Sequence, residues 1–181
     1  MPLTIDHLVH ANVVCSDFDR SLDFYTRLLG ARILGQPFEF DAGDDFRAIL
    51  DVTGPVRCRA ALLSWSSQDT DTYLDLLHFT DDGGAPAPRT AKDAGLARLG
   101  LRVGDMDTAM AWITEHGIPV VGGPVTLVPM PGRRRRVVTI LDPDGTLLNL
   151  MEFSELSALS ALSALSALSA LSARPVENGR G

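Results

Sequence analysis

The chain has 181 residues, of which 45% are hydrophobic and 22% are charged. This length suits one domain of ordinary size or two very small ones, and the composition is typical of a globular chain. Sixteen Lys and Arg against 23 Asp and Glu give a formal net charge of −7, which repels phosphate backbones. Because no apolar run is long enough to span a membrane either, we expect neither a nucleic acid nor a membrane as a partner.

The two cysteines, Cys15 and Cys58, are too few for a disulfide framework and too far apart for a zinc ligand set. The first residues also lack the basic and then apolar segments of a signal peptide. These features together predict a cytoplasmic protein.

The first half of the chain begins with a predicted strand at 8–14. Ser16 and Asp17 can cap a helix, and apolar residues at helical spacing continue it until Gly30 ends it. The next predicted elements are an extended segment at 31–38, a short helix at 44–50, and strands near 57–64 and 72–79.

Residues 81–95 are rich in Asp, Gly, Pro and Ala, which predicts a linker. The same order of elements then begins again. It comprises a strand at 98–103, a helix at 105–116, an extended piece near 120–121, and strands near 136–141 and 146–153. The segment 142–145, Asp-Pro-Asp-Gly, predicts a tight turn between the last two strands, and 125–132 with its prolines predicts a loop.

The second half repeats the first. A shift of 88 positions places His10 on Arg98 and Asp17 on Asp105, and one deletion inside the helix places Gly30 on Gly117. A shift of 74 places 73–79 on 147–153. We therefore expect two modules, 1–80 and 96–153, each a strand, a helix and three strands. A single module would leave one face of its sheet exposed, so we expect the other module to cover that face.

From Ser154 onward leucine recurs at every third position. Since a helix turns about 100° per residue, this period carries the leucines around the helix instead of along one stripe. Residues 154–181 therefore favour a loosely packed or partly disordered low-complexity tail. A helix that docks on a neighbouring subunit is the alternative.

The stretch 10–30, from His10 to Leu-Leu-Gly30, resembles the opening module of the vicinal oxygen chelate superfamily, and the 142–145 turn is similar to its closing signature. This superfamily includes glyoxalase I, bleomycin-resistance proteins, extradiol dioxygenases, fosfomycin-resistance enzymes and methylmalonyl-CoA epimerase. The resemblance implies an α+β fold in which two tandem βαβββ modules form an open, eight-stranded, cup-like barrel. It also implies a homodimer, with swapped or unswapped pairing left open.

The resemblance further implies four inward-facing positions, where metal-using members place their ligands. Here these positions hold His10, Asp75, Arg98 and Asn149. A guanidinium stays protonated and has no lone pair to donate, so Arg98 cannot ligate a cation. We therefore expect no catalytic metal; a divalent metal, if bound, would use His10 and Asp75.

Two interpretations of these residues remain open. In the first, His10 transfers a proton, Asp75 is its partner, and Arg98 stabilises an oxyanion of the substrate. In the second, Asp75 and Arg98 form a buried ion pair and the cup binds a ligand without reaction. In both, strand alternation and the resemblance predict the ligand-binding residues to be Asn12, Val14, Tyr73, Leu77, Gly100, Arg102, Leu147, Asn149 and Met151.

The function that we expect is binding of a small anionic or oxygen-rich metabolite, with metal-independent proton transfer of the isomerase, lyase or cyclase type. The Ala-, Arg- and Gly-rich composition suits a high-GC bacterium, which by analogy suggests secondary metabolism. One alternative is a protein that sequesters a drug, similar to bleomycin-resistance proteins. Another is a metal-dependent glyoxalase or dioxygenase.

Overall fold

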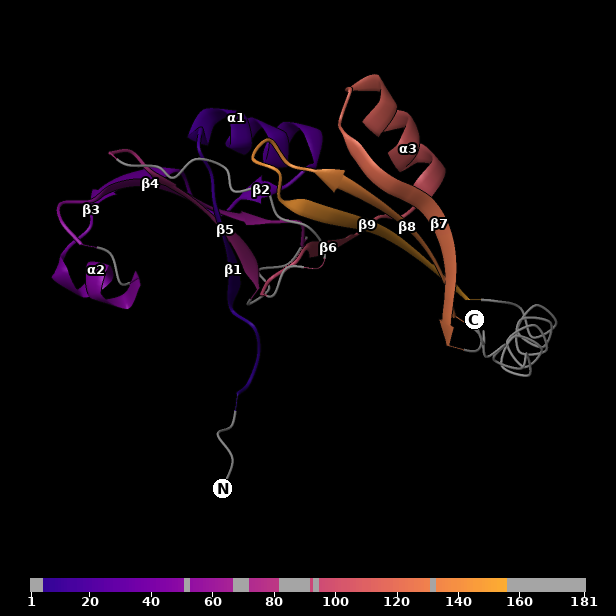
Figure 1. The fold of residues 1–181 in the computed structure, drawn as a ribbon, viewed down its shortest axis with the longest axis horizontal. Helices are drawn as coiled ribbons and strands as arrows, with labels where there is room; N and C mark the ends of the chain where they lie inside the picture. Colours follow the sequence, from indigo (N-terminus) through magenta and orange to yellow (C-terminus); the bar gives the residue numbers. More distant parts are fainter. Residues whose placement is uncertain are drawn as a thin grey trace, which may run out of the picture. The chain divides into compact units, whose positions relative to one another are not determined.

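The computed structural model describes residues 5–50, 53–66, 72–81, 92, 95–130 and 133–155 (Figure 1). The chain divides into two compact units. The first comprises residues 1–90 together with 142–146, and the second comprises 91–141 together with 147–181. Most of the predicted linker at 81–95 and the predicted tail from residue 156 onward lie outside the described residues. No helix in the described part is both long enough and apolar enough to cross a bilayer.

The first unit is a mixed sheet with a helix on one face. Strand order is β1-β5-β4-β2, with β3 paired to β4; β1 and β5 run parallel and the other pairs are antiparallel. The elements are β1 (His10–Val14), α1 (Phe18–Asp23), the π-helical turn η1 (Phe24–Leu28), β2 (Arg32–Ile33), β3 (Phe38–Asp41), α2 (Asp44–Leu50), β4 (Arg57–Ser64) and β5 (Tyr73–Phe79).

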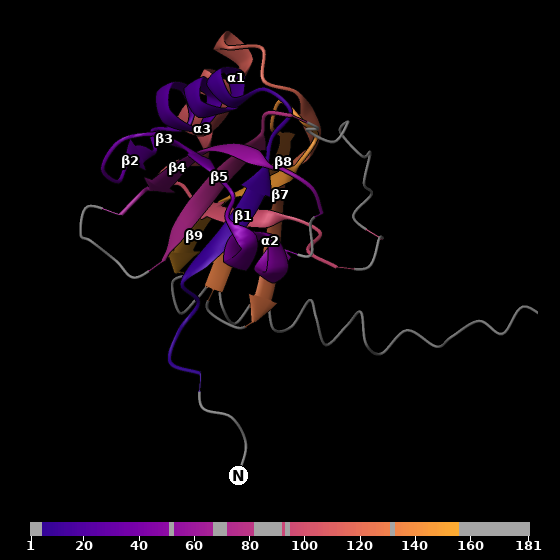
Figure 2. The same ribbon diagram turned by 90° about the vertical axis from the view of Figure 1, so that its left-hand side faces the viewer.

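Helix α1 begins where its sequence signal predicts, because the Asp17 side chain accepts a hydrogen bond from the Arg20 backbone N–H at 3.0 Å. The helix lies along one face of the first sheet, as Figure 2 shows. Phe18 of α1 and Phe24 and Tyr25 of η1 are buried, and alternate strand residues on that face are buried as well. The opposite face of this sheet is therefore the one left for a ligand.

The second unit repeats this plan with strand order β6-β9-β8-β7, in which β6 and β9 run parallel. Helix α3 has an equivalent cap, Asp105, and buries Met106 and Ile113. The elements are β6 (Leu99–Arg102), α3 (Met106–Glu115), β7 (Val120–Met130), β8 (Arg133–Leu141) and β9 (Leu147–Glu155). The predicted α+β architecture with two sheets is confirmed, and neither sheet closes on itself among the described strands.

The extra residue in the first helix of the repeat has a structural explanation. The two capping aspartates are 88 positions apart, whereas the two glycines after the helices are 87 apart. The last turn of the first helix is the π-helical η1, which accommodates one residue more than an α-helical turn, and α3 has no such turn. Gly30 and Gly117 then end their helices with φ of 71° and 61°.

Two expectations from the sequence are wrong. Residues 125–130 of the predicted loop form part of β7, because Val125 and Leu127 pair with β8 residues, and register shifts accommodate the irregular positions; residues 131–132 lie outside the described part. The sequence also favours core positions over ligand contact for both tryptophans, but they are less buried than core residues. Trp65 and Trp112 are 38% and 42% exposed, and the Trp65 indole N–H donates to the Leu29 carbonyl at 2.7 Å.

Candidate ligand-binding face

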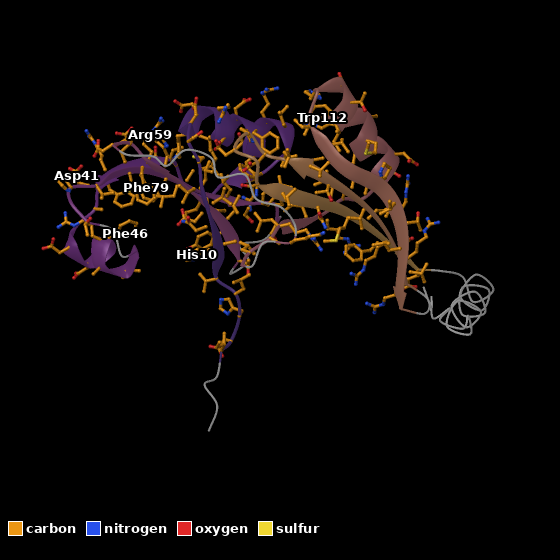
Figure 3. All side chains as sticks on the ribbon, in the orientation of Figure 1. His10, Asp41, Phe46, Arg59, Phe79 and Trp112 are labelled. Atoms are coloured by element: carbon orange, nitrogen blue, oxygen red, sulfur yellow. The ribbon has the colours of Figure 1, made fainter. Side chains whose placement is uncertain are left out.

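The first unit gathers predicted site residues on the sheet face opposite α1. The parallel register aligns His10 with Tyr73, Asn12 with Asp75 and Val14 with Leu77, so strand alternation directs all six side chains to the same face. In Figure 3, His10 lies on the other side of this sheet from Arg59. The Arg59 guanidinium packs over the Phe18 ring of α1, 4.3 Å from its centroid.

The polar centre of this face is Asp75. Its Oδ2 accepts a hydrogen bond from the Asn12 amide at 3.1 Å, whereas its Oδ1 is buried without a hydrogen-bond partner among the described residues. A buried acceptor without a partner costs free energy and is uncommon in folded proteins. A ligand hydroxyl that donates to Oδ1, once the atoms that cover this oxygen have moved aside, would remove this cost.

The His10 ring packs against an aromatic neighbour, and within the described part of the chain no hydrogen bond to its ring nitrogens is found. It stacks on the Tyr73 ring with centroids 5.4 Å apart and planes 19° apart, and the residue is exposed. Its ring nitrogens remain available to a ligand, which a group that moves a proton needs.

The donor set does not fit the metal that the superfamily resemblance implies. The first unit offers His10 and Asp75, and one oxygen of Asp75 already accepts from Asn12. Within the described ranges, no three His, Cys, Asp or Glu residues are grouped so that they could hold a metal ion. Catalytic sites for such metals usually have three good protein ligands, and His10 and Asp75 supply only two.

Farther along β5 the same face becomes apolar. Cys58, Ala60 and Leu77 form a buried cluster against which Phe46 and Phe79 pack, and Figure 3 shows both phenylalanines on the His10 side of the sheet. The sequence prediction ended at Leu77 and missed these phenylalanines. Period-two alternation from Asp75 could have indicated Phe79, but nothing in the sequence places α2 and its Phe46 over this face.

The second unit brings together another group of the predicted residues. Register pairs Gly100 with Asn149 and Arg102 with Met151, and Arg98 is exposed immediately before β6. The Asn149 side-chain oxygen accepts from the Thr139 hydroxyl at 3.0 Å. Leu147, also predicted for this face, is buried at the start of β9.

Two ionisable residues that alternation assigns to the helix-covered faces are found there. His78 Nδ1 lies 2.9 Å from the Cys15 carbonyl oxygen. The Glu152 carboxylate accepts from the backbone N–H of Met106 at 2.8 Å and lies 3.5 Å from Arg136. Both side chains therefore serve the packing of a helix on its sheet.

Comparison with known proteins identifies the family. Residues 4–150 match the family model of the Glyoxalase/Bleomycin resistance protein/Dioxygenase superfamily. The chain belongs to this superfamily. It is 28% identical over 144 residues to a 2-epi-5-epi-valiolone epimerase from Actinomyces sp., which covers 78% of this chain and 76% of that protein.

Solved structures of superfamily members have the same fold. A glyoxalase family protein from Bacillus cereus superposes with a TM-score of 0.66 at 19% identity, covering 83% of this chain and 96% of that one. An antibiotic-binding protein from Streptomyces sp. superposes with a TM-score of 0.52 at 25% identity, covering 84% of this chain and all of that one. These two neighbours support the fold, and the superfamily includes both catalysts and binding proteins.

Proposed function

We propose that this superfamily member binds a small, oxygen-rich metabolite on the His10–Asp75 face and catalyses a metal-independent proton transfer of the epimerase type. The observation that carries the proposal is the buried Asp75 Oδ1, which has no hydrogen-bond partner among the described residues, on the same sheet face as the exposed His10. The similarity to an epimerase that acts on 2-epi-5-epi-valiolone supports this type of reaction.

In the proposed reaction His10 and Asp75 have separate roles. The His10 imidazole takes a proton from a carbon next to the substrate carbonyl, which leaves an enolate. A water molecule then gives a proton to the other face of that carbon, and the His10 imidazolium releases its proton to solvent. Asp75 accepts a hydrogen bond from a substrate hydroxyl through Oδ1, while Asn12 holds its other oxygen at 3.1 Å. Asp75 thus fixes the position of the substrate relative to the base.

The test is incubation of the protein with 2-epi-5-epi-valiolone in D₂O, followed by NMR. We expect deuterium to enter the carbon next to the carbonyl, and His10→Gln to lower the rate by about 100-fold or more. His7→Gln is the matched control, because His7 is exposed and precedes β1 in the same unit, and it should keep the full rate. Exchange that His10→Gln leaves unchanged would contradict the assignment.

The second candidate function is sequestration of a toxic compound. It is favoured by the likeness to an antibiotic-binding protein and by the apolar end of the face at Leu77 and Phe79. In that case a bound compound is recovered unchanged, no deuterium enters it, and His10→Gln binds as tightly as the wild type. The same D₂O experiment therefore separates the two functions.

A further inference from the structure

A second feature, on the other unit, is a group of arginines around one aromatic ring. The Arg135 and Arg102 guanidinium carbons lie 5.1 and 5.8 Å from the centroid of the Phe153 ring. Register aligns Arg135 with Phe153 and Arg102 with Met151, which places these side chains on the face of the second sheet opposite α3. Arg133, two residues before Arg135, points to the same face.

Unlike Arg136 of β8, these arginines have no ion pair among the described residues. Arg136 faces α3 and lies 2.6 Å from Asp107. In contrast, no carboxylate among the residues placed by the structure lies within ion-pair distance of Arg102, Arg133 or Arg135. The acidic side chain aligned with this face is Glu155, which is exposed and opposite Arg133 in the register.

The missing carboxylates are notable because acidic residues outnumber basic ones by 23 to 16 in this chain. Two guanidinium groups near one ring repel each other, and the Phe153 ring, 40% exposed, offsets this only in part. An anion held between them would remove the repulsion, and guanidinium groups match the geometry of carboxylate and phosphate oxygens.

The surroundings of the arginines indicate what the anion is attached to. Val137 is aligned with Met151 on the same face, next to Arg135 and Phe153. On the neighbouring strand, Val125 and Leu127 are 50% and 49% exposed, and they align with Val137 and Arg135. Exposed apolar surface beside the charges suits the carbon skeleton of an organic anion better than a free inorganic ion.

We propose that the face formed by Arg102, Arg135 and Phe153 is a binding site for an organic oxyanion, a carboxylate or phosphate group carried on an apolar body. The Arg102 and Arg135 guanidinium groups bind the oxyanion, and Phe153 holds both groups in position. Its three residues all belong to the second unit, and the proposal does not rest on proton transfer by His10.

The test is calorimetric titration of the full chain with phenyl phosphate, with phenol and inorganic phosphate as probes that lack the charge or the ring. We expect phenyl phosphate to bind more tightly than either, and Arg102→Gln and Arg135→Gln each to raise its Kd by about tenfold. Arg134→Gln is the matched control: it removes the same charge from the same strand, but Arg134 faces the other way and hydrogen-bonds Ser154 at 3.2 Å.

The proposal is overturned if phenyl phosphate does not bind at millimolar concentration, or if Arg134→Gln weakens binding as much as Arg135→Gln. It is also overturned if inorganic phosphate binds as tightly as phenyl phosphate, since the apolar surface then plays no part. Circular dichroism of each variant separates lost binding from lost folding, and Arg135→Lys, which keeps the charge, should lose less affinity than Arg135→Gln.

Discussion

At the scale of single residues, one buried carboxylate organises the turn between β8 and β9. Asp142 is 5% exposed, and its Oδ1 accepts from the backbone N–H groups of Asp144 and Thr146 at 3.0 and 2.6 Å. Its Oδ2 accepts from the Tyr25 hydroxyl at 2.8 Å. Burial, and then the negative charge of Asp142, raise the pKa of Tyr25 far above its ordinary value, so this hydroxyl remains a donor.

Tyr25→Phe should lower the free energy of unfolding by about 1–3 kcal/mol, because it leaves Asp142 Oδ2 buried without its donor. Chemical denaturation measures the change. Tyr73→Phe removes the same atom from a half-buried ring on the opposite face of the sheet and should change stability by less. Equal losses of unfolding free energy in the two variants would show that the buried Tyr25 hydrogen bond stabilises the fold no more than the Tyr73 hydroxyl does.

The raised pKa values of the two buried thiols predict that the fold loses stability at alkaline pH. Burial raises the pKa of Cys15 from 9.0 to about 11 and also raises that of Cys58. Above pH 9 the unfolded chain releases these protons while the folded chain keeps them, so stability is full below pH 9 and falls as pH approaches 11. For Cys15 the slope is at most about 1.4 kcal/mol per pH unit, and Cys58 acts in the same direction.

Denaturation midpoints measured between pH 8 and 11 check this expectation. Cys15→Ala should reduce the slope relative to the wild type, whatever it does to the stability at pH 8. A slope that Cys15→Ala leaves unchanged would assign the alkaline loss to other groups.

At the scale of elements, the sequence predicts the helices and the central strands well and the irregular segments poorly. The predicted bounds of α2 and β4 agree with the structure, because capping, periodicity and β-branched or apolar runs are local signals. The π-helical turn η1 and the bulged course of β7 were not predicted. They depend on how the chain packs, which local sequence does not record.

The candidate site shows the same limit. Alternation and the resemblance place His10, Asn12 and Asp75 on one face, and the register agrees. The unpaired Asp75 oxygen and the Phe153–Arg135 cluster were not anticipated, because each depends on which side chains remain without partners after folding. Whether a side chain finds a partner depends on which residues surround it after folding. The alternation of residues along a strand does not reveal this.

Two adjacent glycines in β7 offer a test of this irregular strand. Gly123 has φ of 94°, and a Cβ atom there would lie 2.5 Å from the Val137 carbonyl oxygen, whereas Gly122 has open space. Gly123→Ala should therefore lower the free energy of unfolding by about 1–3 kcal/mol, and Gly122→Ala should have little effect. Thermal denaturation of the pair decides it; similar midpoints for both variants would contradict the close approach.

At the scale of the whole molecule, the division into units does not follow the order of the chain. The turn 142–146 belongs to the first unit, although the strands on either side of it, β8 and β9, belong to the second. Asp144 accepts from the Ser16 backbone N–H at 3.0 Å and from Arg20 at 2.9 Å, and it also bonds the Ser16 hydroxyl. The repeat in the sequence predicts two modules but gives no sign that the first unit would include a turn from the second half of the chain.

Because this turn of the first unit continues on both sides into strands of the second, we expect the wild type to unfold in one calorimetric transition. Asp144→Ala should lower the midpoint of this transition and broaden or split it, since the first unit then loses contacts with the turn that joins those strands. Asp23→Ala is the control: it removes an exposed ion pair with Arg27 on the same helical segment and should change stability by less than about 1 kcal/mol. A wild type with two transitions would contradict the expectation.

The contacts of the 142–146 turn with the first unit form late during synthesis. A ribosome makes the N-terminal half first, yet Tyr25 and Ser16 receive their partners Asp142 and Asp144 only after more than 110 further residues have been added. The N-terminal half of the nascent chain therefore cannot complete its native contacts until residues 142–144 have been synthesised.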